Sequence, residues 1–217
     1  MTALTLGFPR RNARAPLVFF ILQNNFYKES KGFFMKRCGW VKLSDEIYKA
    51  YHDEEWGKPL HNDRALFELF SLETQSAGLS WLTVLKKREG YRNAFANFVL
   101  EKVARLGEMD VERILSEGEV IKSRPKIEAI IHNARIFETI AKEFGSLDAY
   151  FWGYVEGKTI VNDIPDYKTA ACTSSISDAL TKDLKKRGVK FIGSTTIYAF
   201  MQACGMVNDH ENDCDYK

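Results

Sequence analysis

The stretch "SISDALTKDLKKRGVKFIGSTTIYAFMQACG", residues 175–205, decides the expected fold. It holds two segments with the apolar spacing of helices, joined by "GVKFIGS". We expect the first helix to begin at Ser175 or Ser177 and to end at Gly188, because serine suits an N-cap and glycine a helix end. A connection this short, with Gly188 and Gly193 in it, predicts a helical hairpin whose two helices meet at a steep angle.

This hairpin offers groups that can bind an anion. Backbone N–H groups in the glycine-bearing turn and at the start of the second helix attract phosphate. The basic residues of the same region are Lys182, Lys185, Lys186, Arg187 and Lys190. One interpretation is that DNA phosphates bind here, with Lys190, Gly193, Ser194 and Thr195 as the candidate contacts. An ordinary helical hairpin with a solvated basic face explains the spacing equally well.

Helical patterns also dominate the rest of the chain. "NDRALFELFSLETQ" (62–75) offers Asn62 or Asp63 as an N-cap before a helix, and "SWLTVLKKRE" (80–89) continues the helical pattern. The clearest helix is predicted for 123–145, with Pro125 in its first turn and Gly145 at its end. No alternating strand pattern persists over six residues, so we expect an all-α domain.

Length and composition favour one soluble globular domain. The chain has 217 residues, 45% of them hydrophobic, and a formal net charge of +2. Residues 1–34 carry five bases and one acid, so the remainder is mildly acidic and bulk charge does not indicate a nucleic-acid binder. We interpret 1–34 as an extension that is disordered or not native, with a signal or transit peptide as the alternative, and 35–217 as the domain. Its apolar run is too short to cross a bilayer, so we expect a cytoplasmic protein.

Two cysteine–histidine pairs, far apart in the chain, suggest a metal site. Cys38 and His52 lie near one end, and His210 and Cys214 near the other. Two thiolates and two imidazoles form a closed tetrahedral set suited to a structural zinc ion. A zinc hydrolase would instead need an open coordination position. Unrelated buried cysteines and surface histidines would give the same pattern, and spacing alone does not exclude them.

Several motifs together give the chain a family resemblance. They are "CGW" (38–40), "AYHDEEWG" (50–57), "AGLSWLTVLKKRE" (77–89), "KIEAIIHNAR" (126–135), residues 177–205 and "VNDH" (207–210). In order and spacing the chain resembles DNA-3-methyladenine glycosylase I, of the helix-hairpin-helix DNA glycosylase superfamily. The resemblance implies an all-α helix-hairpin-helix DNA glycosylase fold with the hairpin at about 176–204. It also implies a zinc site that joins segments 35–60 and 205–217.

The resemblance also assigns roles to individual residues. It implies one structural zinc ion held by Cys38, His52, His210 and Cys214. It implies a damaged-base pocket in which Glu73 is the catalytic and base-reading acid, with Trp81, Tyr48 and Tyr51 as further substrate-binding residues and Trp56 beside them. The family commonly has glycine after this glutamate, where this chain has Thr74, and it differs again at Gln75 and Ser76. These departures bear on fine substrate preference rather than on the reaction.

The implied activity is excision of 3-methyladenine from alkylated double-stranded DNA. The base is flipped out and its N-glycosidic bond is hydrolysed, which leaves an abasic site. Lyase-active relatives carry a lysine at the start of the second hairpin helix, where this chain has Thr195, so the resemblance implies a monofunctional enzyme. We expect it to act as a monomer at the nucleoid, without a protein partner or a membrane. The alternative is a non-catalytic, zinc-stabilised helix-hairpin-helix protein that binds DNA.

Overall fold

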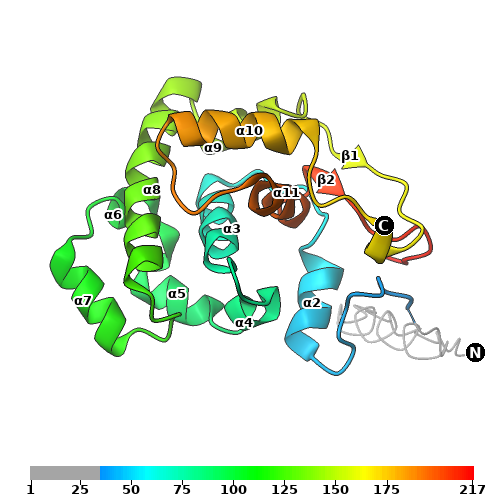
Figure 1. Ribbon diagram of the computed structural model, residues 1–217, viewed down its shortest axis with the longest axis horizontal. Helices are drawn as coiled ribbons and strands as arrows, with labels where there is room; N and C mark the ends of the chain where they lie inside the picture. The colour runs from blue at the N-terminus through cyan, green and yellow to red at the C-terminus, as the bar shows by residue number, and fades with distance from the viewer. Residues whose placement is uncertain (1–34) are drawn as a thin grey trace, which may run out of the picture. The chain divides into compact units, whose positions relative to one another are not determined.

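The computed structural model describes residues 35–217, of which 36–217 form one compact unit. The predicted extension, 1–34, lies outside the described residues. The described chain is mostly helical, as predicted (Figure 1). Its helices are α2 (Glu46–Glu54), α3 (Asp63–Gln75), α4 (Trp81–Leu85), α5 (Arg88–Ala94), α6 (Leu100–Val103), α7 (Glu108–Glu117), α8 (Arg124–Phe144), α9 (Leu147–Gly153), α10 (Ser175–Lys186) and α11 (Ser194–Ala203), with 3₁₀ turns η1 (Ala96–Phe98) and η2 (Tyr167–Thr169).

Helix α3 is the central element of the fold. It begins after Asn62, whose side-chain oxygen accepts a hydrogen bond from the Ala65 N–H at 3.0 Å, so the predicted N-cap is confirmed. Every residue from Leu66 to Gln75 is buried, because α3 packs against α4, α8, α9 and α11. When neighbouring elements cover a helix on all sides, its polar residues are buried as well. Glu73 is therefore placed in the interior by the helix on which it lies.

Helix α8 agrees closely with its prediction. It begins after Ser123 with Pro125 in the first turn and ends at Gly145, whose φ of 90° is left-handed. The segment 80–89 differs from its prediction, because it forms the end-to-end pair α4 and α5 rather than one helix. At the junction, Arg88 pairs with Glu55 of the chain after α2 and with the buried Glu68 of α3. This junction ties the N-terminal helices to the central one.

The predicted hairpin is formed by α10 and α11. The Ser174 hydroxyl caps α10, and Gly188, with φ of 93°, turns the chain after it. The turn is held from outside by Asn133 of α8, a buried side chain that bonds both backbone groups of Lys190. Its Oδ1 accepts from the Lys190 N–H at 2.9 Å, and its Nδ2 donates to the Lys190 carbonyl at 3.1 Å. The hairpin is thus fixed on the longest helix.

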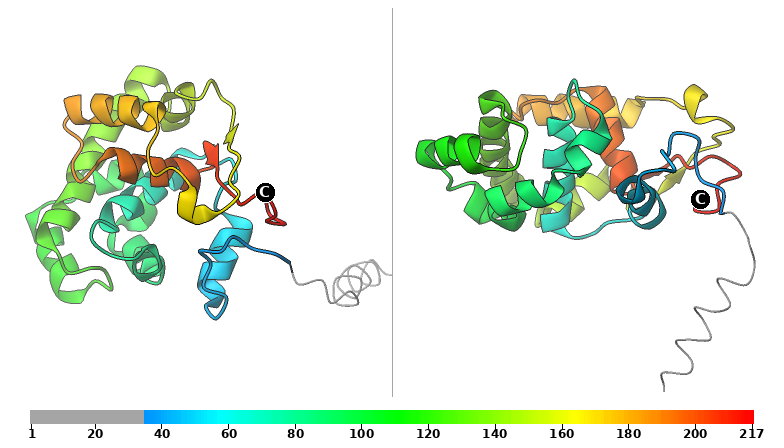
Figure 2. Two further views of the ribbon diagram at one scale, coloured as in Figure 1. Left: turned by 45° about the vertical axis from the view of Figure 1, so that its right-hand side comes forward. Right: turned by 90° about the horizontal axis from the view of Figure 1, so that it is seen from below.

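Two strands of two residues each were not predicted. β1 (Ile160–Val161) and β2 (Val207–Asn208) pair in parallel, and Ile160 faces Val207 in the register. A strand of two residues leaves no alternating pattern in a sequence. The pairing sets the loop between β1 and α10 beside the C-terminal tail (Figure 2). In the described part of the chain, no helix combines the length and apolarity needed to cross a membrane.

Candidate active site and metal centre

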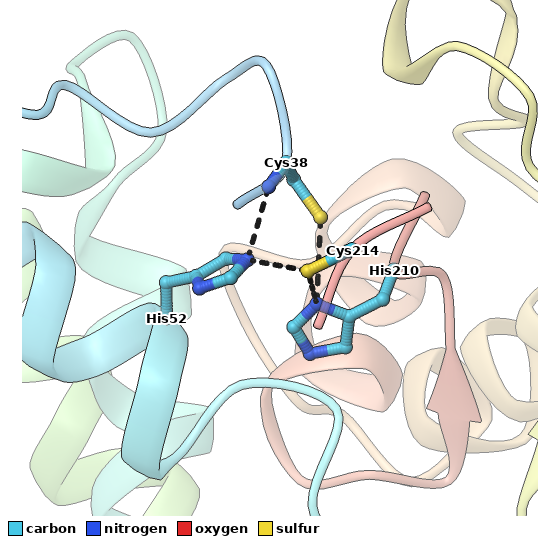
Figure 3. A group of neighbouring side chains, drawn as sticks. All are labelled: Cys38, His52, His210 and Cys214. Carbon is cyan, nitrogen blue, oxygen red and sulfur yellow. Dashed lines mark hydrogen bonds between the residues drawn. The ribbon is translucent and has the colours of Figure 1, made fainter. Parts of the chain in front are cut away.

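The four predicted metal ligands converge from the two ends of the described chain. Cys38 precedes α2, His52 lies on α2, and His210 and Cys214 lie in the C-terminal tail (Figure 3). All four are buried, and their ligand atoms lie within 4.8 Å of one another. The Sγ atoms of Cys38 and Cys214 are each 3.4 Å from His210 Nδ1, and Cys214 Sγ is 3.6 Å from His52 Nε2. Tetrahedral zinc bound to sulfur and nitrogen would separate such atoms by about 3.5 Å.

Hydrogen bonds fix both imidazoles in the tautomers that a metal requires. His52 Nδ1 lies 2.8 Å from a carboxylate oxygen of Asp53, and His210 Nε2 lies 3.1 Å from the Trp56 carbonyl oxygen. These oxygens can only accept, so the protons are on His52 Nδ1 and His210 Nε2. The remaining ring nitrogens face the sulfur atoms, and His52 Nε2 also accepts a hydrogen bond from the Cys38 N–H at 3.4 Å. Arg37 in turn pairs with Asp53 at 2.6 Å, which holds the carboxylate in place.

Burial keeps both imidazoles neutral and opposes ionisation of the Cys38 thiol in the absence of a cation. It raises the pKa of the Cys38 thiol to about 12 and lowers the pKa of His210 to about 4, and it also lowers that of His52. Both imidazoles are therefore neutral, as ligands must be. A divalent cation is the partner that can stabilise two desolvated thiolates. The residues thus form a cluster that could hold a metal ion.

A cavity of about 240 Å³ lies beside this cluster. Its size is slightly below the roughly 300–1,000 Å³ of sites for drug-sized ligands, so it suits a single heterocyclic ring system. All four predicted base-pocket residues line it. The complete lining is Trp40, Tyr48, Tyr51, Trp56, Glu73, Trp81, Tyr167, Ala170, Ala199, Gln202 and Asp209.

Glu73 and Asp209 are the two acids of this cavity, and they differ in their partners. The Glu73 side chain is only 6% exposed, and burial alone raises its pKa to about 8. Within residues 35–217 its carboxyl group has no hydrogen-bond partner, whereas Glu68, one turn earlier, pairs with three arginines. Burying an ionisable group without a partner destabilises the protein. A buried, unpaired acid in a cavity is typical of a ligand-binding or catalytic site.

Aromatic rings surround the acid. The ring centroids of Tyr51 and Trp81 lie 5.4 Å apart, and those of Trp40 and Trp56 lie 4.9 Å apart. The Trp81 indole N–H is buried and has no acceptor among the described residues. The cavity therefore combines π faces with one unpaired acid. This is suited to a flat, cationic or polarised ring.

Residues 40–217 match the family model described as methyladenine glycosylase. The chain belongs to the methyladenine glycosylase family. It is 47% identical over 181 residues to the DNA-3-methyladenine glycosylase of Haemophilus influenzae, which covers 83% of this chain and 97% of that protein. It is 48% identical over 180 residues to DNA-3-methyladenine glycosylase 1 of Escherichia coli, covering 83% of this chain and 96% of that one.

A solved member of the methyladenine glycosylase family has the same fold. It is a variant of 3-methyladenine DNA glycosylase I in complex with 3-methyladenine, and it superposes with a TM-score of 0.78 at 39% identity. The match covers 80% of this chain and 93% of that structure. The resemblance inferred from the motifs and the predicted fold are thus confirmed.

The predicted DNA contacts of this methyladenine glycosylase lie on the hairpin, apart from the cavity lining. Lys190 and Thr195 are exposed. Gly193 is the N-cap of α11, and the Ser194 hydroxyl bonds that of Ser177 at 2.7 Å. The Ser194 hydroxyl thus joins the two helices of the hairpin.

Sequence reasoning missed six lining residues of this family member, two of which are the small residues Ala170 and Ala199. Trp40 lies two residues after the candidate ligand Cys38, and its place in "CGW" was a usable signal. Gln202 and Asp209 come from α11 and the tail; Asp209 accepts hydrogen bonds from Asn162, Tyr198 and Gln202. Tyr167 lies in a loop without periodicity, so nothing in the sequence pointed to it.

Proposed function

We propose that this protein is a DNA glycosylase that flips 3-methyladenine out of alkylated double-stranded DNA and releases it by hydrolysis. One observation carries the proposal: an unpaired, buried carboxyl group, Glu73, lies in an aromatic cavity sized for one base. Membership of the methyladenine glycosylase family supports it. The names of the two bacterial relatives describe the same activity.

The aromatic walls would recognise the damaged base by its charge. Methylation at N3 makes adenine cationic while it is attached to the sugar. A cation against an aromatic face gains roughly 0.5–2 kcal/mol, more when water is excluded. Trp81 and Tyr51 supply adjacent faces, and Tyr48 closes the same wall. Neutral bases would gain less, so the cavity selects for alkylated purines.

Glu73 would identify the base as an adenine and match its charge. Its carboxylate can accept the hydrogens of the exocyclic amino group. In the empty site a pKa of about 8 keeps much of this group protonated at neutral pH. A cationic base next to it lowers that pKa, so the carboxylate forms as the base enters. Charge recognition and base recognition thus involve the same side chain.

The chemical step needs little catalytic assistance from protein side chains. The cationic base leaves as a neutral molecule, so no strong general acid is needed, and water adds to the sugar. Only interactions that strengthen in the transition state accelerate this step, and flipping the nucleotide into a shaped cavity supplies the orientation. Thr195 stands where lyase-active relatives carry a lysine. We therefore propose a monofunctional enzyme that leaves an abasic site.

The metal cluster has a structural part in this proposal. Zinc suits two thiolates and two imidazoles, and Cys38, His52, His210 and Cys214 leave it no open position. A bound zinc ion would join the N-terminal arm to the C-terminal tail. The hairpin, with Lys190, Gly193, Ser194 and Thr195, would contact the DNA backbone. We propose action on DNA in the cytoplasm, as a monomer.

Release of free base tests the function. Purified protein is incubated with methylated duplex DNA, and the released bases are separated by chromatography. We expect 3-methyladenine in the soluble fraction and intact strands that break only after alkali. Binding to DNA without any released base would contradict the proposal and favour a non-catalytic DNA-binding protein.

A further inference from the structure

One wall of the cavity comes from the loop between β1 and α10. Tyr167 and Ala170 of this loop line the cavity, and Tyr167 begins the turn η2. The Asp166 side chain caps this turn by accepting a hydrogen bond from the Lys168 N–H at 2.9 Å. Apart from the three-residue turn η2, the loop contains no helix that could pack against the rest of the fold. Its position must therefore be set by what it touches.

Glu211 fixes the loop to the opposite end of the chain. This side chain is 8% exposed and lies in the tail between the two ligands His210 and Cys214. Its Oε1 accepts a hydrogen bond from the Tyr167 N–H at 2.9 Å, and its Oε2 accepts one from the Gly39 N–H at 2.6 Å. Hydrogen bonds to an ionised acceptor are shorter and stronger than neutral ones. One carboxylate thus joins the tail, the N-terminal arm and the cavity wall.

Close packing places the Tyr167 ring against Gly39. A Cβ atom on residue 39 would lie 2.9 Å from Tyr167 Cε1, so only glycine leaves room for the ring there. A second tie keeps the loop on the tail: the Ile164 N–H donates to Asn212 Oδ1 at 3.0 Å, and the Asn212 N–H donates to the Ile164 carbonyl at 2.8 Å. The Tyr167 ring is therefore packed against Gly39, and the loop that carries it is tied to the tail.

We propose that Tyr167 is a further base-contacting residue of this site and that Glu211 is the positioning residue that holds it there. The inference rests on the proposed function. The loop supplies an aromatic face beside Trp40 and Trp56, which line the same cavity. A base then meets rings from the N-terminal arm and from the loop before the hairpin. Glu211 acts on the base only through Tyr167.

Binding of free 3-methyladenine, followed by quenching of tryptophan fluorescence, tests Tyr167. Stacking on an aromatic side chain is worth about tenfold in affinity per base. We expect Tyr167→Ala to weaken binding of the free base about tenfold. It should also raise the KM for methylated DNA. Tyr167→Phe keeps the ring and should stay within about twofold of the parent. Thr173→Ala, at an exposed position of the same loop, is the matched control and should bind the base like the parent.

A double-mutant cycle tests Glu211. Glutamine has one carbonyl oxygen, so Glu211→Gln can accept from only one of the two amides. We expect it to weaken base binding severalfold with unchanged metal content, and to add nothing to Tyr167→Ala. Gly39→Ala displaces the ring while leaving the carboxylate intact and should give the same loss. Additive losses from Glu211→Gln and Tyr167→Ala would contradict the positioning role.

The outcomes separate this inference from the proposed function. A parent protein that releases no base from methylated DNA contradicts the function itself. A parent that releases base, together with Tyr167→Ala that binds and excises equally well, contradicts this inference alone.

Discussion

The carbonyl oxygen of Trp56 accepts a hydrogen bond from His210 Nε2 at 3.1 Å, while the Trp56 indole lines the cavity. The two rings also meet edge to face, with centroids 4.7 Å apart. One residue therefore selects the tautomer of a candidate metal ligand and forms a wall of the cavity. The candidate metal cluster and the cavity thus have Trp56 in common, so we expect a change in the cluster to alter the cavity.

Disruption of the candidate metal cluster should therefore affect both metal binding and stability. In Cys38→Ser we expect loss of bound metal and a fall in stability of several kcal/mol, because a structural metal contributes its binding free energy to folding. Metal content by mass spectrometry and thermal melting measure the two effects. Cys172→Ser alters an exposed cysteine outside the cluster and is the control. Equal metal content and melting temperature in Cys38→Ser and the parent would contradict the metal site.

Asn133 should affect DNA binding without affecting the base site. It is 1% exposed and holds the hairpin turn through both backbone groups of Lys190. Asn133→Ala leaves those groups unpaired, at a cost of about 1–3 kcal/mol in stability. We expect weaker DNA binding by fluorescence anisotropy and an unchanged affinity for free 3-methyladenine. Thr139→Ala, on the exposed side of the same helix, should change neither. Unchanged DNA binding in Asn133→Ala would show that the turn needs no support from α8.

The helices and the hairpin could be predicted because their signals are local. The stops at Gly145 and Gly188 and the N-cap at Asn62 depend on residues next to the helix. The metal ligands could be paired only through the family resemblance, because Cys38 and His210 are far apart in the chain. Tyr167 and Glu211 could not be found at all, since their contact depends on how a loop folds onto the tail.

The raised pKa of Glu73 predicts that the stability of the protein depends on pH. The pKa of Glu73 is about 8 in the folded protein and near its ordinary value of 4.5 in the unfolded chain. Between these values the folded state holds a proton that the unfolded state has released, so this group lowers the free energy of unfolding as pH rises from 4.5 to 8. Glu73→Gln removes that decline.

Thermal melting at pH 5, 6.5 and 8 measures the effect. The melting temperature of Glu73→Gln should exceed that of the parent by a margin that grows with pH. Glu101→Gln, at an exposed position on α6, should show no such trend. A margin that is constant or shrinks with pH would mean that Glu73 is not desolvated in the folded protein.

The position of Trp81 in the cavity wall predicts that the proposed site selects a charged base. Trp81→Leu removes a π face that lies 5.4 Å from the Tyr51 ring, and we expect excision of 3-methyladenine to fall roughly tenfold. Trp81→Phe keeps a smaller face and should lose less. Excision rates at saturating enzyme on methylated DNA measure both. Equal rates for the leucine and phenylalanine variants would contradict a role for the π face.

The most direct test of the account is release of 3-methyladenine from methylated DNA by the parent and by Glu73→Gln, compared side by side at neutral pH. Removing one side chain that stabilises the charge of a transition state costs about 100- to 1,000-fold in rate. We predict rapid release by the parent, a loss of that order in Glu73→Gln, and the same metal content in both. Release by Glu73→Gln at the rate of the parent would contradict the central claim that this buried acid recognises the base.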